Sequence, residues 1–290
     1  ITTVLDAVAI GDVRDGGDRL ENLEKMINAV EETQKRGLNR AEHRLHLRCE
    51  LPHHTTLPLF EKLVGREPVS LVSLMDHSPG QRQFANIEKY REYYQGKYSL
   101  TDAQMHEYEE EQLALAARWS QPNRTAIAGM CRERQIALAS HDDATHDHVV
   151  ESHLLGSVIA EFPTTFEAAE SSRRHGMNVL MGAPNIVRGG SHSGNVAASR
   201  LASLDLLDIL SSDYYPASLL DAAFRVADDE SNTFTLPQAI RLVTKNPATA
   251  LNLHDRGEIA EGKRADLVLA HRKGEHIHID HVWRQGKRVF

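Results

Sequence analysis

Acidic and histidine side chains recur at the ends of apolar segments along this chain of 290 residues. The residues at these ends are Glu50, Asp76, His77, His141, Asp142, Asp143, Glu161, Asn185 and Asp213. Carboxylates and imidazoles are the groups that bind zinc or another divalent ion. Such an ion lowers the pKa of bound water toward about 7, and a neighbouring carboxylate can accept the proton. If the fold brings them together, these residue types predict metal-assisted hydrolysis.

Each of these positions also has a purely structural interpretation. Asp and Asn at strand ends often form turns, because their side chains accept hydrogen bonds from nearby backbone amides. For a single position we weigh the two interpretations equally, and it is the recurrence that favours a shared site. Other histidines are weaker candidates. His46, His53 and His54 are alternatives for ligand or substrate contact, whereas the histidines near 146–153 and 276–281 are expected on solvated faces.

A glycine-rich segment, "GAPNIVRGGSHSGN" (182–195), follows a late apolar run. Small residues let backbone amides approach an anion closely, and arginine offers a two-pronged donor to phosphate. We predict an anion-binding loop, although such loops are often merely flexible. Its candidate residues are Arg188, Gly189, Gly190, Ser191 and His192.

The apolar segments themselves are predicted to be strands. They cover 1–8, 43–51, 68–80, 134–143, 158–165, 178–185 and 205–216, and helical patterns or loops follow them. Alternation of this kind indicates a parallel sheet with helices outside. One further strand before Ile1 would make eight, so we predict an α/β fold of the (β/α)8 TIM-barrel type that lacks its first strand in this chain. A Rossmann-type sheet is the competing fold, but no G-x-G-x-x-G lies at a strand-to-helix turn. In a barrel the strand ends converge on one mouth.

Two segments stand outside this alternation. Residues 81–135 are charged, Tyr-rich and then amphipathic, and they predict a helical insertion. Residues 256–290 predict short strands with turns, the C-terminal part of a small β-sandwich, leaving 1–255 as the barrel domain. The chain begins inside a strand without an initiator Met. We therefore expect a missing N-terminal piece that carries the first barrel strand and the partner strands of the sandwich.

Composition excludes several functional classes. Lys and Arg total 33 against 41 Asp and Glu, a net charge of −8, which argues against non-specific binding of nucleic acid but allows an anionic small substrate in a local field. The chain contains no apolar run of about 20 residues, so we expect no membrane partner. Two cysteines make no disulfide framework, which favours a cytoplasmic location.

Several motifs resemble the amidohydrolase superfamily. "KNPATALNL", "GEIAEGKRADLVL" and "HVWRQGKRV" are similar to its C-terminal signature, while "ASHDDAT" and "SSDYYP" resemble its metal-site strands. The resemblance implies one or two divalent ions, zinc in the first place and manganese or another metal as alternatives. It implies Glu50 and His141 as metal ligands, His77 as a further ligand, and Asp213 as both ligand and general base.

A narrower resemblance is carried by "LRCELPH", "SLMDHSPGQRQF", "AEFPTTFEAA" and "MGAPNIVRGGSHSGN". Together they are similar to the diphosphatase family of the carbon–phosphorus lyase pathway. That family implies hydrolysis of alpha-D-ribose 1-methylphosphonate 5-triphosphate to the 5-phosphate and pyrophosphate, hence a small anionic phosphorylated substrate as partner. It is also compatible with a homodimer.

Two departures from the superfamily pattern keep alternatives open. Its paired first-strand ligands should precede Ile1, and Glu161 stands where many relatives carry a histidine. Either the metal count differs or Glu161 substitutes for that ligand. The alternative functions are hydrolysis of a cyclic amide or deamination of a purine within the same superfamily, and a catalytically degenerate scaffold subunit.

Overall fold

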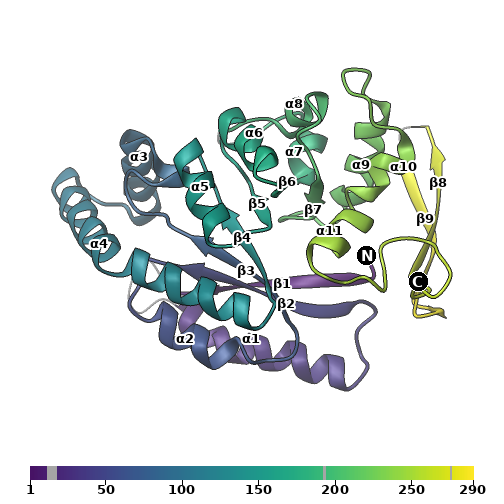
Figure 1. Ribbon diagram of the computed structural model, residues 1–290, viewed down its shortest axis with the longest axis horizontal. Coiled ribbons are helices and arrows are strands. Elements are labelled where there is room, and N and C mark those ends of the chain that lie inside the picture. Colours follow the sequence, from purple (N-terminus) through teal and green to yellow (C-terminus); the bar gives the residue numbers. More distant parts are fainter. Residues whose placement is uncertain (12–17, 192–193, 275) are drawn as a thin grey trace.

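Seven parallel strands form the central sheet in the computed structural model, which describes residues 1–11, 18–191, 194–274 and 276–290 (Figure 1). The strands are β1 (Thr3–Ile10), β2 (Glu42–Glu50), β3 (Val69–Met75), β4 (Ala137–His141), β5 (Ile159–Glu161), β6 (Asn178–Gly182) and β7 (Ile209–Ser211). Each strand pairs with the next one along the chain, without a change of direction. This sequential order is that of a barrel wall and not of a doubly wound sheet. The prediction of a barrel-type α/β fold is therefore confirmed.

Alternation along β2 shows how the sequence assigns the two faces of the sheet. Leu45, Leu47 and Cys49 are buried in a core with Leu23 and Ile27 of helix α1 (Asp18–Lys35). The intervening side chains, His46, Arg48 and Glu50, point to the opposite, inner face, because successive side chains of a strand alternate. The inner face begins with an apolar layer of Leu71, Ala137, Ala139, Ile159, Leu180 and Ile209. Polar groups follow it toward the carboxyl ends.

Helices cover the outer face of the sheet. They are α2 (Thr56–Leu63), α5 (His146–Leu154), α6 (Phe166–Arg174), α7 (Ala183–Arg188), α8 (Ala198–Ser203), α9 (Ser218–Asp228) and α10 (Leu236–Arg241). The last helix, α11 (Lys245–Ala250), instead packs through Ala250 against the apolar inner layer. Threonine side chains cap α5 and α6: Thr145 Oγ1 accepts a hydrogen bond from His148 N–H, and Thr165 Oγ1 accepts one from Ala168 N–H. These caps satisfy amides that have no partner within the helix. They set where each helix starts after its strand.

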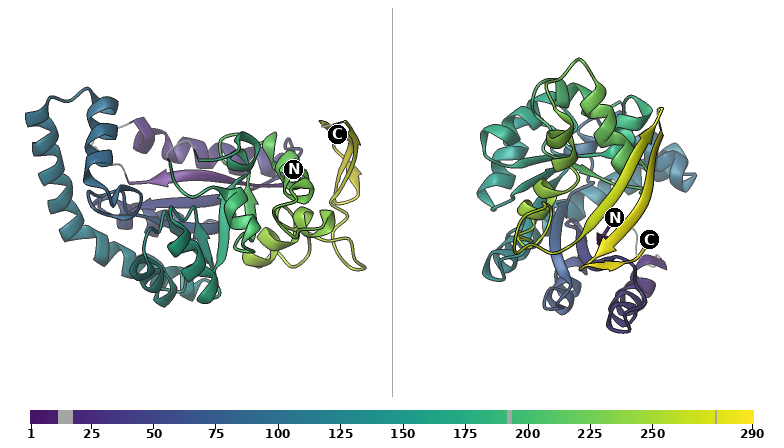
Figure 2. Two further views of the ribbon diagram at one scale, coloured as in Figure 1. Left: turned by 90° about the horizontal axis from the view of Figure 1, so that it is seen from above. Right: turned by 90° about the vertical axis from the view of Figure 1, so that its right-hand side faces the viewer.

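The predicted insertion forms a short 3-10 turn η1 (Arg82–Phe84) and two helices, α3 (Ile87–Tyr98) and α4 (Asp102–Glu133). Phe84, Tyr90, Tyr94, Met105 and Tyr108 make a separate apolar cluster between them. The insertion lies beyond the carboxyl ends of the first strands, at one end of the long axis of the molecule (Figure 2). It can therefore cover the edge of the sheet at which the predicted site residues end.

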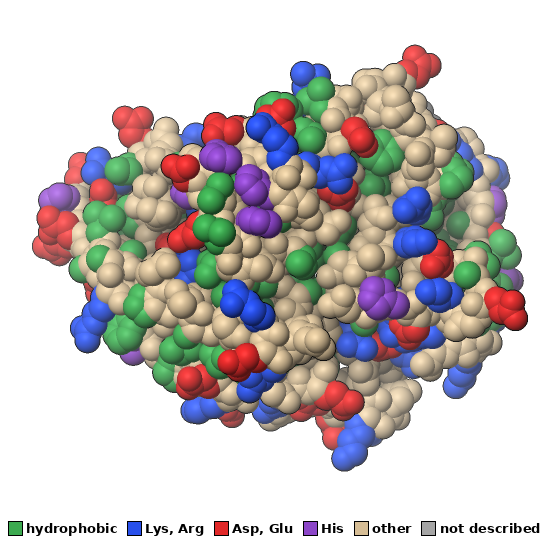
Figure 3. Space-filling model, in the orientation of Figure 1, with side chains coloured by type: hydrophobic (Ala, Val, Ile, Leu, Met, Phe, Trp, Pro, Cys, Tyr) green, Lys and Arg blue, Asp and Glu red, His purple; other side chains and the backbone are tan. Residues whose placement is uncertain are grey.

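Three antiparallel strands, β8 (Leu267–Lys273), β9 (His276–Arg284) and β10 (Lys287–Arg288), form a second sheet at the other end (Figure 1). Among the residues described, no helix has the length and apolar character that a membrane crossing requires. On the face shown in Figure 3, acidic and basic side chains are interspersed, and a group of histidines lies over α5 and α6. Of the histidines of α5, His146 and His153 are exposed, as expected, whereas His148 is half-buried.

Glu42, at the start of β2, ties the C-terminal segment to the barrel. Its Oε2 accepts a hydrogen bond from Arg256 Nη1 at 3.0 Å, and Arg264 also contacts this oxygen. Burial would raise the pKa of Glu42, but the two guanidinium groups outweigh it and lower the pKa to about 2. The ionised form is thus stabilised by folding.

The Glu42→Gln substitution should therefore destabilise the protein in a pH-dependent way. Because the folded-state pKa is depressed, the contribution is present above the unfolded pKa of about 4.5 and is lost as the pH falls toward 2. Above pH 5 we expect a loss on the order of 2–3 kcal/mol in the free energy of unfolding. Thermal or urea unfolding of the wild type and the variant, at pH 7 and at pH 3, measures the difference in their free energies of unfolding. The exposed Glu133→Gln is the matched control, and equal losses at both pH values would contradict the interpretation.

Candidate metal centre

His77, His141 and Asp142 bring three potential ligand atoms within 4.8 Å of one another. His141 is the last residue of β4 and Asp142 follows it, while His77 lies two residues after β3. Asp142 Oδ2 is 3.3 Å from His141 Nε2 and 3.8 Å from His77 Nε2. The left-handed backbone of Asp142, with φ of +56°, turns the chain at the strand end. Neighbouring parallel strands thus deliver the donor set to one edge.

A carboxylate holds the other nitrogen of each histidine. Glu50 Oε2 lies 2.7 Å from His77 Nδ1, and Glu161 Oε2 lies 2.7 Å from His141 Nδ1. Because a carboxylate only accepts hydrogen bonds, each Nδ1 carries a proton and each Nε2 is directed to Asp142. Metal-binding histidines are commonly oriented by such a carboxylate. The donors present therefore fit a divalent ion.

The electrostatics of the group also favour a cation. Burial would lower the pKa of His77, but Glu50 and Asp142 outweigh it and raise the pKa to about 10. Burial opposes ionisation of Glu161 as well, yet its interaction with His141 holds its pKa well below the usual range. The same negative environment that keeps a proton on His77 stabilises a metal ion in its place, and binding of the ion would release that proton.

A chain of hydrogen bonds runs from His141 through Glu161 and Ser73 to His46 and fixes the orientation of the His141 ring. Ser73 Oγ donates to Glu161 Oε2 at 2.8 Å, and His46 Nε2 lies 2.6 Å from Ser73 Oγ. Burial lowers the pKa of His46 to about 4, so its ring is neutral. With the serine proton used toward Glu161, His46 Nε2 must be the donor to Ser73. This chain of hydrogen bonds leaves His141 Nε2 as a lone-pair acceptor.

Buried arginines of the insertion anchor the two residues that flank the metal group. Arg124 Nη2 of α4 is 3.0 Å from Asp76 Oδ2, and Arg82 pairs with Asp143. Glu151 of α5 joins both arginines. Asp76 precedes His77 and Asp143 follows Asp142, so these ion pairs hold the strand ends from which the metal group projects. The insertion thereby becomes part of the site.

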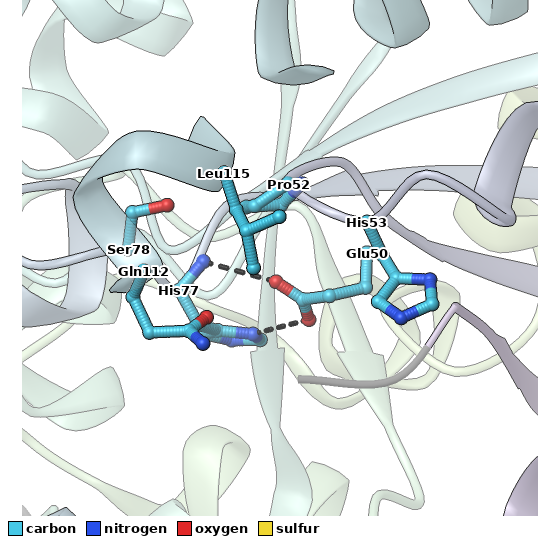
Figure 4. A pocket seen from close by; sticks show the side chains of 7 residues that line it. All are labelled: Glu50, Pro52, His53, His77, Ser78, Gln112 and Leu115. Carbon is cyan, nitrogen blue, oxygen red and sulfur yellow. Dashed lines mark hydrogen bonds and ion pairs between the residues drawn. The ribbon is translucent and has the colours of Figure 1, made fainter. Parts of the chain in front are cut away.

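The predicted ligands Glu50 and Asp213 lie outside the three-residue group. Glu50 accepts from both the ring and the backbone amide of His77, the latter at 3.1 Å (Figure 4). Asp213 lies exposed at the carboxyl end of β7, with φ of +47°. A Cβ on Gly182, at the end of β6, would be 3.0 Å from Asp213 Oδ2. Of the four predicted ligands, the structure brings His77 and His141 together, with Glu50 beside them.

The predicted anion loop follows β6 through the short helix α7. Arg188 is exposed, and its Nη1 donates to the Tyr214 hydroxyl at 3.2 Å, next to Asp213. Gly189 has φ of +83° and ends α7, which is the usual structural reason for glycine there. Ser191 Oγ accepts from Asn195 N–H at 3.3 Å. Gly190 lies between them with φ of +156°, and His192 lies outside the described residues.

Sequence reasoning counted Asp142 among the strand-end candidates but did not assign it as a metal ligand, and it did not select Ser73 or Arg48. Asp142 could have been found from its place beside His141, and Ser73 and Arg48 from strand alternation. Asn185, by contrast, accepts a hydrogen bond from Ala198 N–H, which is a structural role. A small cavity beside the metal group is lined by Glu50, Pro52, His53, His77, Ser78, Gln112 and Leu115 (Figure 4). Gln112 and Leu115 come from α4, so the insertion contributes to the wall of this cavity.

The chain is similar to known proteins over its full length. Residues 40–290 match the model of the amidohydrolase family. The chain is 89% identical over 290 residues to alpha-D-ribose 1-methylphosphonate 5-triphosphate diphosphatase of Escherichia coli (strain K12), across all of this chain and 77% of that protein. It is 34% identical over 110 residues to adenine deaminase of Ligilactobacillus salivarius (strain UCC118), which covers 37% of this chain and 18% of that protein.

Two solved structures resemble the fold. D-hydantoinase from a Bacillus sp. AR9 matches with a TM-score of 0.57 and 11% identity, over 99% of this chain and 77% of that one. Dihydropyrimidinase from Brevibacillus agri NCHU1002 matches with a TM-score of 0.51 and 11% identity, over 99% and 76%. At this identity the likeness concerns the fold alone.

Proposed function

The chain belongs to the amidohydrolase family, and from that premise we propose that it hydrolyses alpha-D-ribose 1-methylphosphonate 5-triphosphate to the 5-phosphate and pyrophosphate. The observation that carries the proposal is the 89% identity to the Escherichia coli diphosphatase over every residue of this chain. The donor set of His77, His141 and Asp142 supports it, because hydrolysis of a phosphoanhydride needs an activated water and a cation beside the phosphoryl oxygens.

A divalent ion, when bound, would acidify its water ligand and neutralise charge on the phosphoryl oxygens. We propose zinc as this ion, with manganese as the alternative, and one or two ions in the site. His77 and His141 would hold it through Nε2, and Asp142 through its carboxylate. Glu50 and Glu161 would fix the two rings by accepting from Nδ1–H.

Asp213 is our proposed general base. Its position at the carboxyl end of β7 puts it on the same edge of the sheet as the metal group, and its carboxylate can accept the proton of the attacking water. Pyrophosphate leaves as a stabilised anion, so proton donation to the leaving group is less important than it is for an amine. Arg188 and the amides of the loop at 189–191 would bind phosphate oxygens near the entrance.

The proposed organisation follows from the same arrangement. Residues 1–255 would form the hydrolase domain with its insertion at about 81–135, and 256–290 would belong to a small β-sandwich. A homodimer remains our proposed assembly.

Phosphorus NMR of the ribose triphosphate substrate tests the function directly. With zinc present, we expect resonances of pyrophosphate and the 5-phosphate to replace those of the triphosphate, as with the Escherichia coli relative used as reference. The Asp213→Asn variant should bind zinc yet lose turnover by roughly 100-fold or more. A zinc-loaded protein that leaves the substrate intact would contradict the proposal, and ammonia release from adenine would favour a deaminase instead. Near-normal turnover by Asp213→Asn would exclude it as the base.

A further inference from the structure

Given the proposed diphosphatase activity, we propose that Arg48 binds phosphoryl oxygens of the substrate, and that its guanidinium and the metal ion compete for the same nitrogen of His141. Neither the family nor the glycine-rich loop points to this residue. It projects from β2 two residues before the last residue of the strand, Glu50.

Arg48 lies on the inner face of the sheet between His46 and Glu50, in register with Ser73 of β3. Its Nη2 is 3.0 Å from His141 Nε2, and its Nε is 3.3 Å from Met75 Sδ. Neither acceptor carries a negative charge that would neutralise the guanidinium. Among the residues that the structure describes, no carboxylate forms an ion pair with Arg48. Glu161 attracts its charge from beyond ion-pair distance, and no carboxylate among those residues occupies its donor fork, which can therefore meet an anion.

The two other arginines near the metal group are already committed. Arg82 pairs with Asp143 and Glu151, and Arg124 pairs with Asp76 and Glu151. Their side chains are 3% and 6% exposed, so neither can turn toward a ligand without breaking a buried ion pair. Arg48 is half-buried and faces the inside of the sheet. It is therefore the guanidinium best placed to meet charge that develops beside the ion.

The hydrogen bond between Arg48 and His141 cannot coexist with a metal bond at the same atom. His141 Nδ1–H donates to Glu161, so the ring has one lone pair, on Nε2. That lone pair accepts either an N–H of Arg48 or a metal ion. An ion bound at His141 Nε2 would displace the Arg48 guanidinium from that nitrogen. The guanidinium would then lie a few ångström from the ion with its donors free. Phosphoryl oxygens that approach the ion are then within reach of the planar donor fork, which matches phosphate geometry.

These contacts predict effects of opposite sign when Arg48 is removed. The Arg48→Met substitution keeps side-chain length but deletes the competing donor and a positive charge beside the cation. We expect zinc to bind about 10-fold more tightly, while turnover of the triphosphate falls by roughly 100-fold or more. The Arg48→Lys variant retains the charge without the planar donor fork. Its zinc affinity and its turnover should both lie between those of the wild type and of Arg48→Met. Damage to the structure of the site would instead weaken both zinc binding and turnover.

The experiment combines zinc titration against a chelator with phosphorus NMR rates of pyrophosphate release, measured as kcat and KM. Arg44→Met is the matched control, since Arg44 lies on the same strand and contacts Glu42 and Ser70 instead. It should leave zinc affinity unchanged. Unchanged or weaker zinc binding by Arg48→Met, or retained turnover, would overturn the inference.

The same experiment separates this inference from the proposed function. If the wild-type protein releases no pyrophosphate, the diphosphatase proposal fails, but two measurements still decide the role of Arg48. The zinc titration decides the competition for His141. Calorimetric binding of inorganic pyrophosphate to the zinc-loaded protein decides the anion contact: a loss of at least 10-fold in Arg48→Met supports it, and equal affinity excludes it.

Discussion

The His141→Ala variant is expected to lose hydrolysis of the triphosphate on the order of 1,000-fold or more, together with most of its zinc affinity. His141 Nε2 faces Asp142 at 3.3 Å, and its Nδ1 is held by Glu161. The substitution removes a ligand and also leaves the Glu161 carboxylate buried without its imidazole partner. Zinc stoichiometry of the purified protein and the initial rate of pyrophosphate release measure the two effects.

The Glu161→Gln variant tests the role of the carboxylate that orients His141 separately from the role of His141 as a metal ligand. The amide oxygen can still accept from His141 Nδ1–H, but it lacks the negative charge that makes the ring a better donor to metal. We expect zinc to bind 10- to 100-fold more weakly, a smaller loss than for His141→Ala. The exposed His146→Ala, in α5, is the control and should behave as wild type. If Glu161→Gln lost as much zinc affinity as His141→Ala, Glu161 would itself be a ligand.

Loss of the Arg124 side chain should strongly destabilise the protein. Arg124 and Asp76 are 6% and 4% exposed and 3.0 Å apart, and Arg124 also contacts Glu151. The Arg124→Met substitution leaves Asp76 buried, and within the described part of the chain its remaining hydrogen-bond donors are the hydroxyl and amide of Ser78. Removal of one partner of a buried pair costs roughly 3–5 kcal/mol. In a protein of this size we expect the Tm to fall by about 10 °C.

A second substitution shows whether the unpaired charge is the cause. In Arg124→Met with Asp76→Asn, the buried carboxylate is gone, and part of the lost stability should return. Arg118→Met, on the exposed side of the same helix, is the control and should change the Tm by no more than a degree or two. A Tm of Arg124→Met close to that of the wild type would show that the ion pair contributes little to folding.

Much of the architecture follows from local patterns in the sequence. The seven strands lie within or close to the predicted segments, because buried parallel strands are short apolar runs bounded by turn residues. The insertion at 81–135 is found as η1, α3 and α4. Alternation along β2 puts Cys49 in the core and Glu50 on the inner face. The family was likewise recognisable from motifs, and the match over residues 40–290 confirms it.

The sequence by itself thus determined the strand order, the edge of the sheet that carries the polar residues, and the family. It could not assign partners among those residues. Glu50, Glu161 and Asp142 are all carboxylates at strand ends. Composition does not distinguish a carboxylate that orients an imidazole from one that offers its oxygen to the metal ion. That distinction depends on which Nδ1 lies 2.7 Å from which oxygen, a product of strand register and of the turn at Asp142.

Only the tertiary structure shows which arginines pair with carboxylates and which one contacts His141. Arg48, Arg82 and Arg124 are separated by tens of residues, and no local pattern relates them. The fold commits Arg82 and Arg124 to buried carboxylates and directs Arg48 to His141, 93 positions further along the chain. Whether a charge is neutralised or available depends on its three-dimensional neighbours, because Coulomb interaction and desolvation act through space and not along the sequence.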